Sequence, residues 1–429
     1  MQGWLIVKTA LAAALAATVG IWSTALAVDV PGGAPAPAGA SAVNPANVSN
    51  QFMVDLYGKL AAKKGNLFFS PYSVSSALTL LERGARGKTA DEMRTMLHLP
   101  LAEQSAEDKK ALDAAYSALI TNLQADNAKR GYQLSVANAI WTQNGESFQP
   151  AFLDDATKVF HAGVEGMNFI TEAESARAKI NTWVAKQTND KIKDLMPADS
   201  ITPATRLVIT NAVYFKGEWA SKFAKPATQR EDFYVGADKA ADKAVQADLM
   251  HQKHRFGYFT DDKCQALELP YKGNELAMLV LLPVAGDHDC GKLESAFSAD
   301  YVRGLVGKLR GCEVNVTLPK WKFTLTYGLN QPLQELGMKD AFGPAADFSG
   351  INGRKDLMVT AVVHKAFIDV NEESTEAAGA TGIAVGRAMA LPAEPPVEFR
   401  ADRPFVYLIF ERASKAILFA GRLADPTEK

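Results

Sequence analysis

The sequence predicts an α+β fold with large, mostly antiparallel β-sheets, and three observations support this class. Of 429 residues, 48% are hydrophobic and 22% are charged, the proportions of a soluble folded chain. Apolar residues recur at helical spacing mainly in the first half of the chain, whereas strand-like runs dominate the second half. Helices first and strands later, without regular alternation, are typical of α+β proteins.

The individual elements follow from periodicity. Helical spacing predicts helices around residues 52–60, 74–81, 93–97, 111–123 and 176–184, and a further helix at 292–309. Strand-like runs, several of them bounded by Gly, Pro or Asp, predict strands at 134–141, 207–215, 276–282, 314–323, 358–370, 405–410 and 416–421. No internal repeat is visible.

Two segments are expected to precede the folded part. Lys8, an apolar run over 9–22 and the Ala-Leu-Ala sequence at 25–27 match a signal peptide over residues 1–27, with an uncleaved membrane anchor as the alternative. Residues 28–46 are rich in Pro, Ala, Gly and Ser and predict a disordered tether. The chain is therefore predicted to be secreted, extracellular or periplasmic, without membrane contact after cleavage.

The charge and the cysteine content argue against two classes of protein, nucleic-acid-binding proteins and small proteins held together by disulfides. The chain has 46 basic and 48 acidic residues, and this net charge of -2 gives no bulk reason to expect nucleic-acid binding. Cys264, Cys290 and Cys312 are too few for a disulfide framework. Cys290 and Cys312 flank the helix expected at 292–309, and the sequence leaves open whether they pair.

The candidate catalytic and metal-binding motifs lack the residues or the spacing that their chemistry needs. The run GARGKT at 84–89 resembles the end of a phosphate-binding loop, but Glu82 stands where that loop needs a glycine. A helix end followed by a new helix is expected there instead. His251 and His254 lie in strand-like sequence without a cluster of cysteines or carboxylates, so no metal site is expected. No enzymatic activity and no cofactor are predicted.

The segment between residues 370 and 405 carries the functional signal. Residues 374–390 read STEAAGATGIAVGRAMA and are followed by LPAEPP, a run of small residues without core-forming periodicity. Such a run predicts an exposed loop, with a flexible linker as the alternative. Taken as a strand, however, alternate residues from Thr375 to Val385 form an uncharged face that suits burial. The segment is therefore predicted to adopt two conformations, an exposed loop and a central strand of the sheet.

Six motifs in order make the sequence resemble the serpin family over about residues 47–426. They are NLFFSPYS at 66–73, TNAVYFKGEW at 210–219, LPK at 318–320, HKA at 364–366, the segment 372–381, and FRADRPF at 399–405. The resemblance implies a single serpin domain over 47–429 with three β-sheets, eight or nine helices and an exposed reactive-centre loop at about 374–396.

The resemblance also implies a function. A serpin presents its loop to a serine protease as a substrate would, and the protease forms an acyl-enzyme with it. The cut loop then inserts into the central sheet and traps the protease covalently. We therefore expect a monomeric inhibitor of elastase-, chymotrypsin- or subtilisin-like serine proteases. The alternative is a non-inhibitory serpin that acts as a binding or chaperone module.

The resemblance assigns functional residues of the family to the matching positions of this sequence. The sheet-opening cluster would be Ser70, Ser73, Asn211 and His364, and the breach, where insertion begins, would be Trp219, Lys320 and Glu372. The reactive-loop hinge would comprise Glu372, Ser374, Thr375, Glu376, Ala377, Ala378, Gly379, Ala380 and Thr381. Inhibitory members usually carry glycine where this chain has Ser374.

The reactive bond is placed by counting sixteen residues on from Glu372, which gives Ala388 before the cut and Met389 after it. Met389, Ala390 or Leu391 could instead precede the cut, and Arg387 would imply a trypsin-like target. The sequence leaves open the identity of the protease, the inhibition of a cysteine protease and any polyanion activator.

Overall fold

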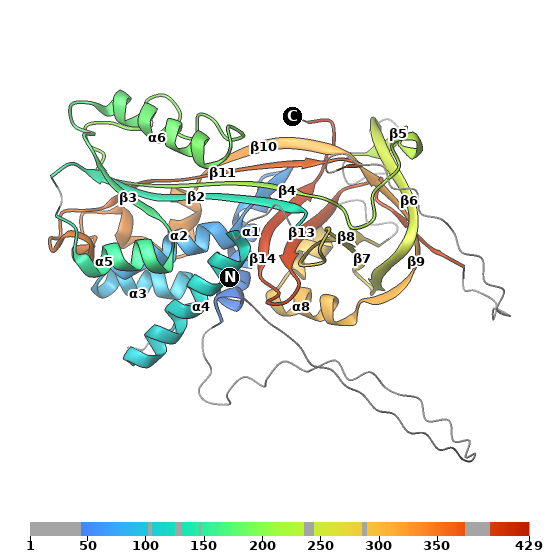
Figure 1. Ribbon diagram of the computed structural model, residues 1–429, viewed down its shortest axis with the longest axis horizontal. Helices are drawn as coiled ribbons and strands as arrows, with labels where there is room; N and C mark the ends of the chain where they lie inside the picture. Colours follow the sequence, from blue (N-terminus) through green and yellow to red (C-terminus); the bar gives the residue numbers. More distant parts are fainter. Residues whose placement is uncertain are drawn as a thin grey trace, which may run out of the picture. The chain divides into compact units, whose positions relative to one another are not determined.

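The computed structural model describes residues 44–101, 105–124, 130–145, 147–235, 244–284, 290–373 and 395–428. The predicted signal peptide and nearly all of the tether lie outside these residues, as does most of the loop at 374–396. The described residues belong to one compact unit, Ala42–Lys429. The α+β class is confirmed, because helices pack on two sheets (Figure 1).

Ten α-helices lie within the described residues, and those predicted in the first half of the chain are all present. They are α1 Pro45–Ala61, α2 Pro71–Gly84, α3 Gly87–Met96, α4 Ala106–Gln124, α5 Pro150–Asp154, α6 Ala173–Gln187, α7 Gly291–Ser295, α8 Ala299–Lys308, α9 Asn330–Glu335 and α10 Ser349–Asn352. Short turns of other helical types are η2 Asp155–Val159, η3 Lys225–Ala227 and η5 Asp340–Phe342. The prediction of a single helix at 292–309 is wrong. Ser298 begins a new helix there, because its side chain accepts a hydrogen bond from Tyr301 N and caps α8.

A five-stranded sheet has the strand order β10-β11-β4-β2-β3. Its strands are β2 Tyr132–Gln143, β3 Gly163–Met167, β4 Leu207–Gly217, β10 Trp321–Gly328 and β11 Val359–Val370. The run 314–323, expected as one strand, is two strands, because the chain leaves β9 at Pro319 and enters the other sheet after Lys320. Two of the four pairings are parallel, β11 with β4 and β2 with β3.

The remaining strands follow the path β1-β14-β13-β8-β7-β6-β9-β12, and β5 joins β6 beside this path. They are β1 Leu67–Phe69, β5 Gln229–Tyr234, β6 Ala244–Thr260, β7 Cys264–Pro270, β8 Leu276–Pro283, β9 Arg310–Pro319, β12 Val397–Arg400, β13 Phe405–Glu411 and β14 Ile417–Leu423. The three expected sheets are therefore two continuous ones here. The 17-residue β6 pairs with β5, β7 and β9 and joins what would otherwise be separate sheets.

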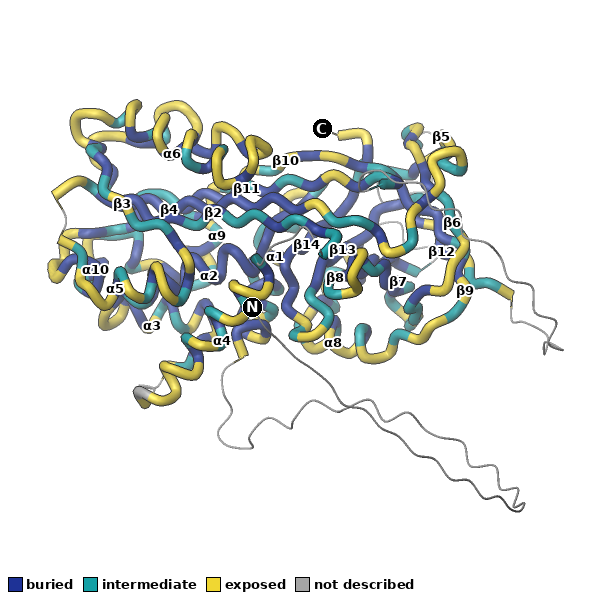
Figure 2. The backbone as a smooth tube through the Cα atoms, viewed as in Figure 1, coloured by how far each residue is buried: buried dark blue, intermediate teal, exposed yellow. Residues whose placement is uncertain are grey.

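Helices cover both faces of the five-stranded sheet (Figures 1 and 2). Ile180 and Val184 of α6 pack in one apolar cluster with Val208 and Ala212 of β4. On the other face α2 is buried along nearly its whole length, and Gly84 permits close packing because a Cβ there would lie 2.3 Å from Ile351 Cγ1. Because both faces are covered, β4 has nine consecutive buried residues, the pattern of a central strand.

Candidate functional site

The candidate site is the seam between β4 and β11, two parallel neighbours in the five-stranded sheet. Their register runs from Val359 opposite Leu207 to Phe367 opposite Tyr214. Beyond this point residues 368–370 still pair with β10, and residues 215–217 still pair with β2, but the two strands no longer pair with each other. The seam is therefore closed along most of its length and open at one end.

A small cavity lies at the open end of the seam. Its walls include Phe215, Gly217, Trp219 and Tyr271 on one side and residues 368–371 with Glu373 on the other. A Cβ at Gly217 would lie 2.6 Å from the Tyr271 ring, so only glycine allows this ring to pack so closely on β4. The predicted loop leaves β11 at this end of the seam.

Side chains from separate elements converge on residues 371 and 372, where β11 ends. Trp219 Nε1 donates to Asn371 O at 3.0 Å, and its ring stacks on Tyr271 at 4.7 Å between centroids. Lys320 Nζ lies 3.2 Å from Glu372 Oε2. The structure thus brings together Trp219, Lys320 and Glu372, the three residues predicted for the breach.

The Glu372 carboxylate is buried yet remains ionised. Burial alone would raise its pKa, but the Thr228 hydroxyl, a backbone N–H and the Lys320 ammonium stabilise the carboxylate, and the pKa falls below its usual value. Thr228 Oγ1 donates to Glu372 Oε1 at 2.7 Å. Thr228 was not predicted, because no sequence signal links it to a residue 144 positions away.

The four residues of the predicted sheet-opening cluster form one buried hydrogen-bond network across the seam. His364 of β11 lies opposite Asn211 of β4, and its Nδ1 hydrogen-bonds Asn211 Oδ1. His364 Nε2 accepts the backbone N–H of Ser70 at 3.0 Å, at the start of α2. Asn211 Nδ2 donates to Ser73 Oγ at 2.6 Å.

A fifth residue, Asn138 of β2, completes this cluster. Its Oδ1 accepts from Asn211 Nδ2 at 2.5 Å and from Ser73 Oγ at 3.1 Å. The sequence analysis missed Asn138. The signal that could have found it is an asparagine inside a strand-like run, which the pairing of β2 with β4 places directly opposite Asn211.

His364 is neutral in this network. Burial lowers its pKa from 6.5 to about 3. The bonding pattern requires the Nδ1–H tautomer, because Nε2 must keep its lone pair to accept the Ser70 N–H. The cluster therefore fastens β4, β11 and α2 together without any charge.

The predicted reactive bond and all hinge residues except Glu372 lie outside the described residues. The assignment of the reactive bond to Ala388 and Met389 and of the hinge to Ser374 to Thr381 therefore stays a prediction. The structure does show both attachment points of the loop. The loop leaves the five-stranded sheet after β11 and returns at β12, which pairs in parallel with β9.

Other candidate groups do not form a site. In the described part of the chain, no group of three or more His, Cys, Asp or Glu side chains could hold a metal ion. His251 lies on β6 and hydrogen-bonds Glu231 at 2.6 Å and Thr317 at 3.1 Å. In this structure Cys290 and Cys312 are not joined to each other by a disulfide. No helix among the described residues is long and apolar enough to cross a membrane.

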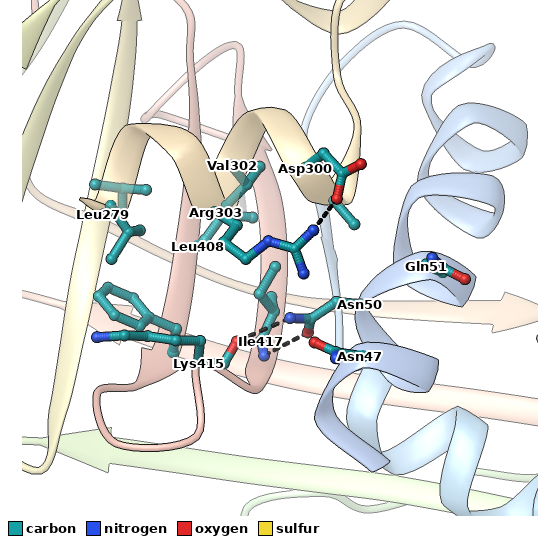
Figure 3. A pocket seen from close by; sticks show the side chains of 13 residues that line it. Asn47, Asn50, Gln51, Leu279, Asp300, Val302, Arg303, Leu408, Lys415 and Ile417 are labelled. Carbon is teal, nitrogen blue, oxygen red and sulfur yellow. Dashed lines mark hydrogen bonds and ion pairs between the residues drawn. The ribbon is translucent and has the colours of Figure 1, made fainter. Parts of the chain in front are cut away.

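A separate pocket lies between α1, α8 and strands β8, β13 and β14 (Figure 3). Asn50 of α1 spans its edge, since Nδ2 donates to Lys415 O and Oδ1 accepts from Ile417 N, both at 2.8 Å. Arg303 of α8 pairs with Asp300. No lining residue of this pocket belongs to β4 or β11. The pocket therefore belongs to the packing of helices on the nine-stranded sheet and not to the seam.

Comparisons with known proteins agree with this architecture. The Serpin family, serine protease inhibitor, matches residues 47–426. An uncharacterized serpin-like protein of Thermococcus kodakarensis is 39% identical over 382 residues, which cover 89% of this chain and 86% of that protein. The leukocyte elastase inhibitor of Bos taurus is 38% identical over 385 residues, which cover 88% of this chain and 98% of the inhibitor.

Solved structures give the same result. The crystal structure of uncleaved ovalbumin matches with a TM-score of 0.78 at 26% identity, covering 90% of this chain and 100% of that chain. Fold, seam and relatives together define a protein of the serine protease inhibitor class. The chain belongs to the serpin family.

Proposed function

We propose that this serpin inhibits serine proteases by inserting its cleaved loop into the seam between β4 and β11. The observation that carries the proposal is the seam itself. Its two strands are parallel, and they are already separated at the end where the loop leaves β11. A segment that turns back after β11 runs antiparallel to both strands, so it can pair with both at once.

The chemistry begins at the loop peptide bond. The protease serine attacks the carbonyl of the residue before the cut, the amine of the next residue leaves, and an ester joins the protease to the loop. About 14 residues from Thr375 to Ala388, at roughly 3.3 Å each, can then carry the tethered protease on the order of 45 Å along the sheet. Distortion of the protease active site during this transfer stops hydrolysis of the ester.

Insertion is favourable because two ladders of backbone hydrogen bonds replace one. The parallel ladder between β4 and β11 is exchanged for two antiparallel ladders, a gain of about a dozen backbone hydrogen bonds. At about 1 kcal/mol net per bond, the gain is roughly 10 kcal/mol. The uncharged face from Thr375 to Val385 supports this insertion, because no charge has to be buried with it.

The alternative is a non-inhibitory serpin that acts as a binding or chaperone module. Ser374 is the departure from the inhibitory pattern that keeps this alternative open, because serine is less free than glycine at positive φ and would slow insertion without preventing it. The small, uncharged hinge from Thr375 to Thr381 favours the inhibitor.

The target class follows from the residue before the cut. Ala388, Met389, Ala390 and Leu391 all fit apolar primary pockets, so we propose elastase-, chymotrypsin- or subtilisin-like targets. The leukocyte elastase inhibitor among the relatives agrees with such a target. We also infer from residues 1–27 that the protein is exported. We propose in addition that it acts as a monomer.

The test is to mix the purified protein with a panel of serine proteases and to search for a complex that survives boiling in detergent. We expect such a complex with an elastase- or subtilisin-like enzyme. Cutting the loop with a non-target protease should also raise the melting temperature by tens of degrees. Loop cleavage with neither a stable complex nor a change in melting temperature would support the non-inhibitory alternative.

A further inference from the structure

A groove lined by basic side chains lies where the end of α2 meets α3 and α4 (Figure 1). Its volume is about 550 Å³, and none of its lining residues belongs to β4 or β11. The proposed insertion of the loop therefore does not use this groove. Its lining carries four cations against two carboxylates, namely Arg83, Arg86, Arg94 and Lys109 against Glu82 and Asp91.

Two of the arginines are anchored by carboxylates. Asp113 Oδ1 accepts from Arg83 Nη2 at 2.7 Å, and Glu82 Oε1 accepts from Arg94 Nε at 2.7 Å. Each of these bonds uses one N–H of a guanidinium group that has five. Arg83 Nε is buried and has no hydrogen-bond partner within the described residues. A buried donor without an acceptor costs free energy, which an oxyanion beside it would recover.

The third arginine, Arg86, is held at the junction of α2 and α3. Its Nη1 donates to the carbonyl oxygens of Arg83 and Ala85 at 3.0 and 2.6 Å. The guanidinium also lies against Gly350, since a Cβ there would come within 2.5 to 2.6 Å of Nη1, Cζ and Nη2. These contacts fix the group in place and use only its Nη1 donors. A guanidinium held in this way presents its remaining N–H groups to an anion without first losing side-chain freedom.

The backbone of the junction adds further donors. The helix α3 begins at Gly87, which lines the groove, and the Arg86 side chain at the N-cap position makes no hydrogen bond to the first turn. The first N–H groups of a helix have no partner within the helix and favour anions. The junction is the GARGKT run, which lacks the glycine that a phosphate-binding loop needs. Arginine side chains stand beside it here, whereas Lys88 pairs with Asp340 and does not line the groove.

The groove also has an apolar lining. Leu99, Leu101 and Leu112 contribute to it, and Leu101 is 59% exposed, which is rare for a large hydrophobic residue in the described part of this chain. An inorganic anion would leave this apolar surface in contact with water. An organic group attached to the anion would cover it and gain affinity from the burial.

We propose that this groove binds a phosphate monoester. The guanidinium groups of Arg83, Arg86 and Arg94 bind the phosphate, since the planar donor fork of arginine matches phosphate oxygens in pairs. The leucines cover the organic part of the ester. This binding site is separate from the seam, and the proposal does not rest on the proposed inhibition of proteases.

The first test is a calorimetric titration of the purified protein with phenyl phosphate and with inorganic phosphate. We expect both to bind and phenyl phosphate to bind about tenfold more tightly, because its ring buries apolar surface. Leu101→Ser should weaken phenyl phosphate severalfold and leave inorganic phosphate unchanged. Equal affinities for the two probes would overturn the assignment to an ester, and no binding of either would overturn the site.

The second test uses substitutions at the cationic residues. Arg86→Gln and Arg94→Lys should each weaken phenyl phosphate about tenfold or more through the loss of charge-assisted hydrogen bonds. Arg94→Lys keeps a positive charge beside the buried Glu82, so it guards against a folding defect. Asp91→Asn should instead tighten binding about two- to threefold, because it removes an exposed carboxylate from the lining.

The matched control is Arg255→Gln, since Arg255 is exposed on β6 and does not line the groove. Wild-type affinity in Arg86→Gln and Arg94→Lys would overturn the proposal, as would an equal loss in the control. Flotation with vesicles that contain phosphatidic acid separates two sources of the phosphate. Co-flotation that Arg86→Gln abolishes would assign it to a lipid headgroup, and no co-flotation would assign it to a soluble ester.

Discussion

Acidification should loosen the seam through His364. In the folded protein burial lowers the pKa of His364 to about 3, while an unfolded chain titrates near the ordinary value of 6.5. The unfolded state therefore takes up a proton as the pH falls below about 6.5, and the folded state does not until about pH 3. The stability that the neutral imidazole contributes is complete above pH 6.5 and is lost on the way down to pH 3.

The size of the effect follows from the same two values. At about 1.4 kcal/mol per pH unit, the loss is about 2 kcal/mol at pH 5 and at most about 5 kcal/mol near pH 3. The contacts give the reason, because a protonated Nε2 cannot accept the Ser70 N–H and leaves that buried donor without its acceptor. The imidazolium would also stand in a cluster without a carboxylate.

The assay is urea unfolding of the wild type and of His364→Gln at pH 7, 6 and 5. The free-energy difference between the two proteins should shrink by about 2 kcal/mol from pH 7 to pH 5, because only the wild type carries the titrating group. His254→Gln is the matched control for the His-to-Gln substitution itself, since His254 is exposed on β6. A difference that stays constant with pH would refute the assignment of a neutral, hydrogen-bonded His364.

Three further predictions address the loop and its hinge. Thr375→Arg places a cation on the face that is buried first, so the variant should still be cut but should become a substrate, and trapping at wild-type stoichiometry would refute insertion from this hinge. Ala388→Arg should shift preference toward trypsin, and mass spectrometry of the released C-terminal fragment should show that it begins at Met389 in the wild type; a start at Ala388 would place Arg387 in the protease pocket. Trp219→Phe removes the donor to Asn371 O at a cost of about 1 kcal/mol and should speed thermal loss of inhibitory activity, whereas an unchanged rate would show that this bond does not hold the hinge.

Much of the seam could be predicted from sequence because its strands are buried on both faces. The runs at 207–215 and 358–370 stand out as nearly continuous apolar stretches, and the structure places β4 and β11 there. By contrast, the sequence showed only strand-like residues around His251 and His254 and not the whole of β6, because eight of its 17 residues are polar or charged and obscure the alternation. The corner at Lys320 was also missed, since apolar residues flank it on both strands and only the change of sheet separates them.

The contacts that fasten the site depend on pairings between distant segments, and periodicity does not report these. Asn138 becomes part of the cluster only through the register of β2 with β4. Lys225 and Thr228 reach the hinge only because β5 folds back on β6 near the end of β11. Family motifs located Ser70, Asn211 and His364, but such motifs carry no information on partners that lie outside them.

The geometry of the seam also implies the order in which it opens. The strands are already apart beyond Phe367 and Tyr214, so the first inserted residues can pair there without breaking any contact between β4 and β11. His364 and Asn211 lie three register positions further in, on the order of 10 Å along the strands. A loop inserting from this end would therefore reach the buried cluster early, before most of the new ladder has formed to offset the loss of its hydrogen bonds. In the proposed mechanism the cluster would therefore act as a barrier on the rate of insertion, whereas the final stability of the inserted sheet would depend on the ladder formed after the cluster has rearranged.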